Sequence, residues 1–398
     1  MRMILFSMKI AIFTDTYPPF INGVSTSAYN LVQTLKNHGH QVVVITPRTD
    51  DGKLEYVDGI IRIPGLELKK MYGYRVTNFY SRKVIKMLKE FGVDIIHNQT
   101  DFGVGQFARI AARELNVPLV YTYHTAYEDY TYYVVHGLMD RIGKKAMREY
   151  AKSIAKTCTE FITPSIKTKE YMRSVGSDIY INVVPTGIDF SLFDESKIDK
   201  EKQAEFKKAH HIGENTKVFL LLGRVAKEKS MDYSIKGFAM YLEKHPEVDA
   251  KLIIVGDGPQ RNELELLVQQ LKVGDKVDFI GKVPANEVPF YYHLADIYTS
   301  ASITETQGLT FMEAMASGTI VLARFDSNLA DTIMDGQTGF FFTDENSFVE
   351  KVERIFALSE EGRKKIIDQA FKTVDMYSIG KFYDNIMEVY NRALKKYW

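Results

Sequence analysis

Two carboxylates with seven residues between them, Glu305 and Glu313, stand around the start of a predicted helix, Leu309–Ala316. Glu305 lies in the loop before this helix and Glu313 in its second turn. Carboxylates accept paired hydrogen bonds from neighbouring hydroxyls, so this spacing suits a sugar at Glu305 and a ribose at Glu313, with the intervening amides near phosphate. Two acidic residues around a helix start can also simply compensate the helix dipole. The pattern indicates a sugar nucleotide, and the dipole explanation stays open.

A cluster of cations, Arg224, Lys227 and Lys229, follows directly after a predicted strand, Lys217–Leu222. An Arg guanidinium can hold two phosphate oxygens at once and a Lys ammonium adds a compact charge. Together they could compensate the charge that builds up on a departing nucleotide. The same run could instead be a solvated charged turn. We take it as a candidate diphosphate site.

Two positions in the first half of the chain could serve the same chemistry. Gly23 stands just before a helix predicted over Ser25–Asn37, where backbone N–H groups and the helix dipole favour an anion, so it is a candidate phosphate contact. His124 follows the predicted strand Leu119–Tyr123, where acid–base or donor-binding residues are expected. The alternatives are a turn glycine with Ser25 as the helix cap, and a structural histidine.

Tyrosines are dense on and after the strand that leads to His124. They could line a cavity for an acceptor with apolar parts, or they could belong to the core. These residues are Tyr121, Tyr123, Tyr127, Tyr130, Tyr132 and Tyr133.

Short β-branched runs alternate with amphipathic helical windows, which is typical of parallel α/β sheets. The predicted strands of the first half are Lys9–Phe13, Gln41–Thr46, Asp94–His97, Leu119–Tyr123, Phe161–Pro164 and Tyr180–Val184. Those of the second half are Lys217–Leu222, Lys251–Val255, Val277–Ile280, Ile297–Thr299 and Thr319–Ala323. The helices between them are expected near Ser25–Asn37, Gly105–Leu115, Asp232–Lys244, Gln260–Lys272 and Leu309–Ala316.

The charged segment Ser191–His211 carries no strand signal, and we interpret it as an interdomain segment. The predicted fold class is α/β, with two Rossmann-like doubly wound parallel-sheet domains facing a cleft, residues 1–190 and 191–378. A terminal helix, 379–398, has one apolar stripe and is expected to complete the first domain. Ligands bind beyond the carboxyl ends of strands in open parallel sheets, which is where the candidate residues fall.

The composition is that of a soluble globular protein, because 45% of the 398 residues are hydrophobic and 51 basic side chains balance 51 acidic ones. Residues 1–190 hold 24 basic and 18 acidic side chains, an excess of six positive charges. Residues 191–398 hold 27 basic and 33 acidic side chains, an excess of six negative charges. A single cysteine, Cys158, excludes an intramolecular disulfide and favours a reducing compartment. The start of the chain has no signal-peptide pattern, and no run of 18 apolar residues predicts a membrane span.

These motifs occur in an order that resembles family 4 of the retaining glycosyltransferases, which have the GT-B architecture. The resemblance covers nearly the whole chain. It rests on Tyr17-Pro18-Pro19 to Gly23-Val24-Ser25, Val184 to Asp189, Gly223-Arg224 to Glu228-Lys229, Gly256 to Pro259, and Glu305 through Glu313. The chain departs from the family where Thr306-Gln307 replaces Pro-Phe and where Asn328 to Asp331 replaces a glycine-rich turn. Both departures affect the prediction of the sugar.

The resemblance implies a catalytic set and a donor-binding set. The catalytic set is His124 beside the reacting sugar, Glu305 on its hydroxyls, Arg224 and Lys229 on the diphosphate, and Asp15 on the acceptor side. The donor-binding set is Gly23, Arg224, Lys229, Val283, Glu305, Gln307, Gly308, Leu309 and Glu313. No Asp-x-Asp motif is present, so no metal site and no tightly bound cofactor are expected, and magnesium would at most stimulate.

Within the family the chain is similar to bacterial 1,2-diacylglycerol 3-glucosyltransferases. That resemblance implies transfer of glucose from UDP-glucose to the 3-hydroxyl of diacylglycerol, with retention of configuration and release of UDP. The alternatives are a related transferase that uses GDP-mannose or a soluble acceptor, a nucleotide-sugar epimerase, and a lipid- or nucleotide-binding protein without catalysis. The oligomeric state stays open.

Residues 62–89 hold eight basic side chains against one acid, with apolar residues at helical spacing. A second basic helix is expected near 141–156. This pattern predicts a peripheral protein on the cytoplasmic face of the cell membrane, with anionic lipids as partners and Tyr72 and Tyr74 in the headgroup layer. The alternative is a pair of ordinary surface helices whose apolar stripes pack on the sheet. Nucleic acid is a poorer explanation, because the net charge is zero.

Overall fold

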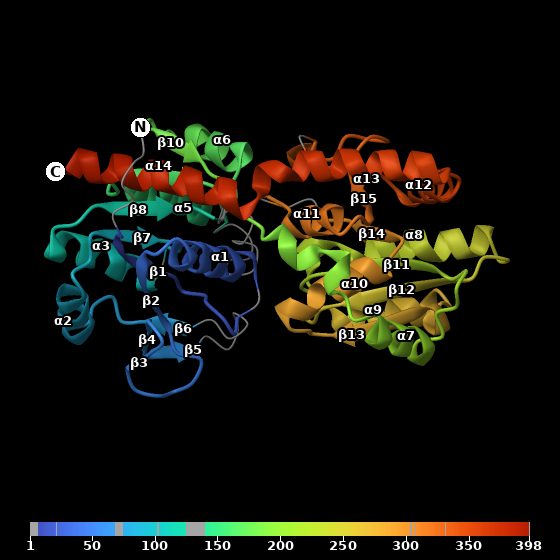
Figure 1. Ribbon diagram of the computed structural model, residues 1–398, viewed down its shortest axis with the longest axis horizontal. Coiled ribbons are helices and arrows are strands. Elements are labelled where there is room, and N and C mark those ends of the chain that lie inside the picture. The colour runs from blue at the N-terminus through green and yellow to red at the C-terminus, as the bar shows by residue number, and fades with distance from the viewer. Residues whose placement is uncertain are drawn as a thin grey trace. The chain divides into compact units, whose positions relative to one another are not determined.

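The computed structural model describes residues 7–20, 22–67, 75–101, 103–124, 140–302, 305, 307–330 and 332–397. The chain forms two compact units, each with its own parallel sheet (Figure 1). Unit 1 comprises Met1–Gly187 and Ile379–Trp398, and unit 2 comprises Ile188–Ser378. The α/β fold class with two doubly wound sheets is thus confirmed.

Unit 1 has an eight-stranded sheet in the order β10-β9-β8-β7-β1-β2-β4-β3, of which only β3 is antiparallel to its neighbour. Its strands are β1 (Lys9–Phe13), β2 (Gln41–Pro47), β3 (Glu55–Val57), β4 (Ile60–Ile63), β7 (Ile95–Asn98), β8 (Leu119–Thr122), β9 (Glu160–Thr163) and β10 (Ile181–Val183). The described helices of this unit are α1 (Gly23–Asn37), α2 (Arg82–Phe91), α3 (Gly103–Leu115), α5 (Asp140–Ala155), α6 (Ile166–Ser174) and α14 (Ile379–Tyr397). A short hairpin, β5 (Gly65–Glu67) and β6 (Arg75–Thr77), stands apart from the sheet.

Unit 2 has a six-stranded parallel sheet in the order β13-β12-β11-β14-β15-β16. Its strands are β11 (Lys217–Leu222), β12 (Ala250–Val255), β13 (Val277–Gly281), β14 (Ile297–Ser300), β15 (Ile320–Arg324) and β16 (Phe340–Phe342). The helices are α7 (Lys200–Ala209), α8 (Met231–Lys244), α9 (Arg261–Gln270), α10 (Val288–Leu294), α11 (Leu309–Ala316), α12 (Glu345–Phe356) and α13 (Glu360–Val374).

The central strands of both sheets are almost continuously apolar and buried, because helices cover both faces. The eleven strands predicted from such runs are all present, with bounds that differ by no more than one residue. The short strands β3 to β6 and β16 are not predicted, since three or four residues give little periodicity.

The segment Ser191–His211, interpreted from the sequence as interdomain, lies within unit 2, which begins at Ile188. Its helix α7 packs through Phe206, whose ring meets Phe290 at 5.4 Å, and Lys202 forms an ion pair with Glu287 at 2.9 Å. The charges that suggest a linker form the exposed face of a helix that packs on the core through Phe206.

Helix α14 closes unit 1 on the face that also holds α1 (Figure 1). Its predicted apolar stripe is buried, from Phe382 to Ala393. Next to the stripe the carboxylate of Glu160, 1% exposed, accepts from Arg392 Nε at 3.0 Å and lies 2.7 Å from Lys396 Nζ. The two cations keep the pKa of Glu160 below its usual value despite burial.

Among the described residues, none of the helices is long and apolar enough to cross a membrane.

Candidate functional site

Each sheet has a place where the strand order reverses, and several of the predicted residues lie on the loops beside it. In unit 2 the chain runs outward from β11 to β13 and then returns to β14 on the other side of β11. The loop after β11 carries Arg224 and Lys229, and the loop after β14 carries Glu305. Loops at such a switch point diverge and leave a crevice for ligand at the carboxyl edge of the sheet.

The loop after β11 is held in place by close packing of its backbone. Val225 and Ala226 are 0% and 2% exposed. A Cβ at Gly256 would lie 1.8 Å from the carbonyl oxygen of Gly223, and a Cβ at Gly258 would lie 2.3 Å from that of Val225. The two glycines therefore let the loop after β12 lock the loop after β11 in place.

Lys229 and Glu305, predicted to contact different parts of one ligand, contact each other. Lys229 Nζ lies 2.5 Å from Glu305 Oε1, and the two side chains are 27% and 13% exposed. Arg224 Nη1 lies 3.9 Å from Glu228 Oε1 on the same loop. The structure thus pairs Lys229 with Glu305 across two loops, and Arg224 with Glu228 within the loop after β11.

Glu313 lies in α11 and accepts a hydrogen bond from the hydroxyl of Tyr292, 3.0 Å away. Burial raises the pKa of Glu313 from its usual 4.5 to about 7. Tyr292, in α10, is itself fully buried, and sequence reasoning missed it. It lies inside a short helix, where a tyrosine gives no signal of a polar role.

Gly308 begins α11 with a φ of 75°, a left-handed conformation that favours glycine. Leu309 is the first residue of this helix. Gln307, two residues earlier, donates from Nε2 to the sulfur of Met312 in the helix, 3.8 Å away. Val283 lies in the loop after β13, partly buried against the core of unit 2. Val283, Gln307 and Gly308 therefore lie on loops at the same edge of the sheet, and Leu309 begins the helix that follows.

In unit 1, Gly23 is the first residue of α1, and its neighbour Asn22 caps the helix by accepting from Ser25 N at 2.8 Å. The alternative in which Ser25 caps the helix is therefore wrong, because its hydroxyl donates to Phe20 O instead. A Cβ at Gly23 would meet nothing within 4 Å. Packing within the described structure thus does not require glycine at this position.

Asp15 follows β1 and serves the fold. Its Oδ1 accepts from Val104 N, at 3.1 Å, and so satisfies an N–H group at the start of α3. Burial raises the pKa of the carboxyl group. This contact gives Asp15 a structural role, whether or not it also faces an acceptor.

His124 follows β8, as predicted, and its Nε2 lies 2.6 Å from Gln99 Oε1. Burial lowers the pKa of the imidazole from 6.5 to about 4, so His124 is neutral at pH 7. Gln99 in turn contacts His97 at the end of β7. Sequence reasoning missed both partners, although the strand-end rule that selects His124 applies equally to the neighbouring strand.

The tyrosines before His124 that the structure describes belong to the core. Tyr121 and Tyr123 are each 1% exposed, and their rings stack on Phe161 with centroids 5.6 and 6.1 Å away. Tyr127, Tyr130, Tyr132 and Tyr133 lie outside the described residues.

The basic stretch over residues 62–89 is only partly available to a surface. Arg75 is 6% exposed and donates to Gly65 O, and Arg62 donates to Pro18 O. The apolar stripe of α2 packs into the core, as expected for the alternative of an ordinary surface helix. The exposed cations of α2 are Arg82, Lys83, Lys86 and Lys89.

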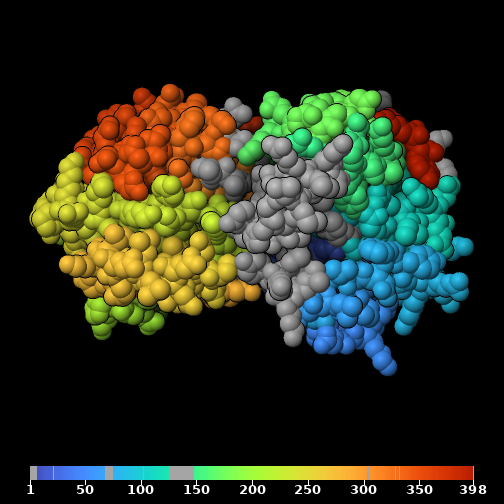
Figure 2. Space-filling view, turned by 180° about the vertical axis from the view of Figure 1, so that it is seen from behind, coloured from blue at the N-terminus to red at the C-terminus, as the bar shows by residue number. Residues whose placement is uncertain are grey.

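Exposed apolar side chains occur on the β5–β6 hairpin and in the segment between it and α2. Leu66 and Val76, paired across the β5–β6 hairpin, are 81% and 41% exposed, and Phe79 is 55% exposed. In Figure 2 the blue segment from β3 to α2 forms an outer edge of unit 1. Lys69, Lys70, Tyr72 and Tyr74 lie outside the described residues, as do the side chains of residues 141–147.

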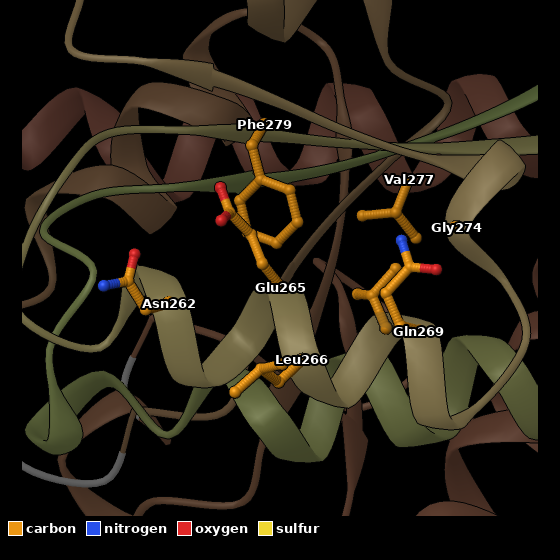
Figure 3. Close-up of a pocket in the computed structure, with 8 residues that line it drawn as sticks. Asn262, Glu265, Leu266, Gln269, Gly274, Val277 and Phe279 are labelled. Carbon is orange, nitrogen blue, oxygen red and sulfur yellow. The ribbon is translucent and has the colours of Figure 1, made fainter.

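A depression of about 550 Å³ lies elsewhere on unit 2, between α9 and β13 (Figure 3). Its lining consists of Asn262, Glu265, Leu266, Val268, Gln269, Gly274, Val277 and Phe279, and none of these is a predicted site residue. Among the described residues, no three His, Cys, Asp or Glu side chains are grouped so that they could hold a metal ion.

Comparison with known proteins gives consistent matches over both units. Residues 21–192 match the family described as Glycosyltransferase Family 4, and residues 202–373 match the family described as Glycosyl transferases group 1. The chain is 35% identical over 354 residues to the alpha-monoglucosyldiacylglycerol synthase of Acholeplasma laidlawii, covering 87% of this chain and 88% of that protein. It is 32% identical over 375 residues to the synthase of the same name from Streptococcus pneumoniae, covering 94% of this chain and 84% of that protein.

Solved structures agree on the fold. A glycosyltransferase from Rickettsia africae superimposes with a TM-score of 0.73 over 98% of this chain and 99% of that one, at 20% identity. A sucrose-phosphate synthase from Thermosynechococcus elongatus gives a TM-score of 0.74 over 98% and 100%, at 19% identity. At these identities the likeness shows the fold alone.

Proposed function

Because the chain belongs to family 4 of the glycosyltransferases, with the GT-B fold, we propose that it transfers glucose from UDP-glucose to the 3-hydroxyl of 1,2-diacylglycerol. The products are α-monoglucosyldiacylglycerol and UDP. The observation that carries the proposal is the Lys229–Glu305 pair at the switch point of unit 2, with Arg224 on the same loop as Lys229, in a chain whose two relatives above are both monoglucosyldiacylglycerol synthases.

The charges of unit 2 fit a nucleotide diphosphate and its sugar. Arg224 and Lys229 offset the charge on the departing UDP, while Glu305 accepts from the hydroxyls of glucose and Glu313 from those of ribose. The pair Lys229–Glu305 holds both groups in position before the ligand arrives. Val283, Gln307, Gly308 and Leu309 complete the donor contacts from their loops.

The residues of unit 1 serve the other side of the reaction. Gly23 offers the N–H groups of a helix start to phosphate, and an open space replaces a side chain there. His124 stays neutral at pH 7 and hydrogen-bonds the reacting sugar. Asp15 holds the loop that contributes to the acceptor side.

In the proposed step the lipid hydroxyl attacks the anomeric carbon on the face from which UDP leaves. The bond between that carbon and the phosphate oxygen breaks, a bond to the lipid oxygen forms, and a phosphate oxygen takes the hydroxyl proton. The configuration is retained, and no carboxylate needs to be a covalent nucleophile. The protein supplies orientation and charge compensation.

The acceptor and the positive charge of α2 favour a membrane surface. Arg82, Lys83, Lys86 and Lys89 are exposed, and each cation near an anionic bilayer contributes about 1 kcal/mol at low salt. The exposed Leu66, Val76 and Phe79 belong to the same part of unit 1. We therefore place the active protein at the cytoplasmic face of the membrane, bound peripherally to anionic lipids.

A matrix of donors and acceptors tests the proposal. UDP-glucose, UDP-galactose and GDP-mannose are each offered with diacylglycerol vesicles, with a soluble sugar and with no acceptor. We expect nucleotide release and a glucosylated lipid by mass analysis with UDP-glucose and vesicles alone. Turnover with GDP-mannose only, as the relative called a GDP-mannose-dependent alpha-mannosyltransferase in Corynebacterium glutamicum would suggest, contradicts the donor. Conversion of the donor without an acceptor indicates an epimerase.

A further inference from the structure

Four side chains of unit 1 form a continuous line of hydrogen bonds that ends at His124. Tyr390 Oη lies 2.7 Å from His97 Nδ1, Gln99 Nε2 lies 2.8 Å from His97 Nε2, and Gln99 Oε1 lies 2.6 Å from His124 Nε2. They come from α14, from the end of β7 and from the end of β8. A residue of the last helix is thus connected to a candidate residue 266 positions earlier in the chain.

The inner members of this line are closed off from solvent. Tyr390 and His97 are 0% exposed and Gln99 is 3% exposed. The adjoining cavity holds only about 10 Å³, too little for a sugar, and its polar lining includes Ser27, Thr122 and Thr186. These side chains therefore act on His124 from within the protein and do not touch a substrate.

The direction of each bond follows from groups that can only donate or only accept. The Gln99 carbonyl oxygen only accepts, so Nε2 of His124 carries a hydrogen. The Gln99 amide nitrogen only donates, so Nε2 of His97 accepts, and the neutral His97 ring donates from Nδ1 to Tyr390 Oη. Thr122 Oγ1, 2.7 Å from the same Nε2, donates to it as well.

We propose that Tyr390, His97 and Gln99 are positioning residues that fix the tautomer of His124, with hydrogen on Nε2 and a lone pair on Nδ1. That lone pair accepts a hydrogen bond from a hydroxyl of the sugar or of the acceptor. The assignment of the tautomer stands on the geometry of unit 1, and its use in catalysis rests on the proposed function. Helix α14 thereby organises the site that it covers.

Removal of the Tyr390 hydroxyl, at the end of the line away from His124, should reverse the direction of the hydrogen bonds along it. In Tyr390→Phe the buried Nδ1–H of His97 loses its acceptor, so His97 favours hydrogen on Nε2, where Thr122 can accept it. The Gln99 amide then has to turn over and present its N–H to His124, which moves the His124 hydrogen to Nδ1. A buried donor without a partner is unfavourable enough to shift this ratio about tenfold or more.

The test is long-range ¹H–¹⁵N correlation on the full chain with ¹⁵N-labelled histidine, without substrate, using His124→Gln to assign the signals. We expect the Nε2–H tautomer of His124 in the wild type and the Nδ1–H tautomer in Tyr390→Phe. The matched control is Tyr383→Phe, which removes a hydroxyl from the same helix that lies 3.0 Å from His40 instead. This control should leave His124 unchanged.

The Nδ1–H tautomer in the wild type overturns the proposal, and so does an equal response to the two tyrosine variants. If Tyr390→Phe does not fold, the same NMR measurement on Gln99→Met and Gln99→Glu tests the proposal. Gln99→Glu keeps an acceptor for His124 and should keep the tautomer, whereas Gln99→Met should lose it and lower kcat about tenfold with an unchanged KM for the donor. Because the tautomer is read without turnover, the wrong donor or acceptor would leave this result intact.

Discussion

The site of unit 2 contains an ion pair between candidate residues, whereas the candidate His124 of unit 1 is neutral at pH 7. In unit 2, Lys229 and Glu305 form a 2.5 Å ion pair at partly exposed strand ends. In unit 1, His124 belongs to a buried line of neutral hydrogen bonds that Tyr390 completes. Charge compensation is what a departing diphosphate requires, and fixed orientation is what an attacking hydroxyl requires. In the proposed reaction the two units therefore contribute by different physical means.

The largest effect should come from the cations of unit 2. Arg224→Ala and Lys229→Ala should each lower kcat about 10² to 10³-fold, because each removes a donor that stabilises developing charge. The matched control is Lys227→Ala, an exposed cation on the same loop, which should change kcat by less than about twofold. Steady-state release of UDP measures kcat for all three variants. Equal losses of kcat in all three would contradict the assignment of Arg224 and Lys229 to the diphosphate.

His124→Ala should lower kcat about 10²-fold, with little change in the KM for the donor. Its burial keeps the imidazole neutral, so raising the salt concentration should leave this loss unchanged. Kinetics at low and high salt check the expectation. A loss that shrinks with salt would show that His124 acts as a charge, and the contrast between the units would fail.

Glu313 should make both the stability of the protein and the binding of the donor depend on pH. Its folded pKa of about 7 lies above its usual 4.5, so folding favours the protonated form. Stability from this group is fully present below pH 4.5 and is lost as the pH rises through 7. Glu313→Gln should therefore be more stable than the wild type at pH 8, by up to about 3 kcal/mol, and equal to it near pH 4. Urea unfolding at both values measures the difference.

Ionisation of Glu313 should strengthen donor binding, since a carboxylate accepts hydrogen bonds from hydroxyl groups better than a carboxylic acid does. The KM for UDP-glucose should fall as the pH rises through about 7 in the wild type, and it should be about tenfold higher and independent of pH in Glu313→Gln. A wild-type stability that does not change relative to this variant between pH 4 and pH 8 would refute the burial of the carboxyl group.

The smallest effect belongs to the surface of α2. Replacing Lys83 and Lys86 by Gln should weaken binding to anionic vesicles about tenfold at low salt, with less effect at high salt. The matched control replaces Lys364 and Lys365, two exposed lysines on α13 of unit 2. Cosedimentation measures both. Equal weakening in the two double variants would show that the charge of the whole chain, and not α2, attracts the vesicles.

The sequence predicts the strands and the residues that follow them, because periodicity and strand ends are local properties. It does not predict contacts between strand ends. Lys229 and Glu305 are separated by three strands in the chain, and only the order of the sheet makes them neighbours. Tyr292 is missed for a similar reason, since its partner Glu313 lies on another helix.

Local patterns also mislead where one residue type can serve two purposes. The basic amphipathic pattern of α2 suggests a membrane surface, and Tyr121 and Tyr123 suggest an acceptor cavity, yet the apolar side chains of both pack in the core. Arg75 counts as a surface cation in the sequence but is 6% exposed. Burial depends on tertiary packing, and an amphipathic pattern alone does not tell which surface its apolar face meets.

The central claim is a transfer that retains configuration, and the most direct measurement is proton NMR of the glycolipid made from UDP-glucose and diacylglycerol vesicles. The coupling of the anomeric proton distinguishes the two linkages. We predict an α-glucoside, formed in equal amount to the UDP released. A β-glucoside, or UDP without any glycolipid, would contradict the proposed reaction.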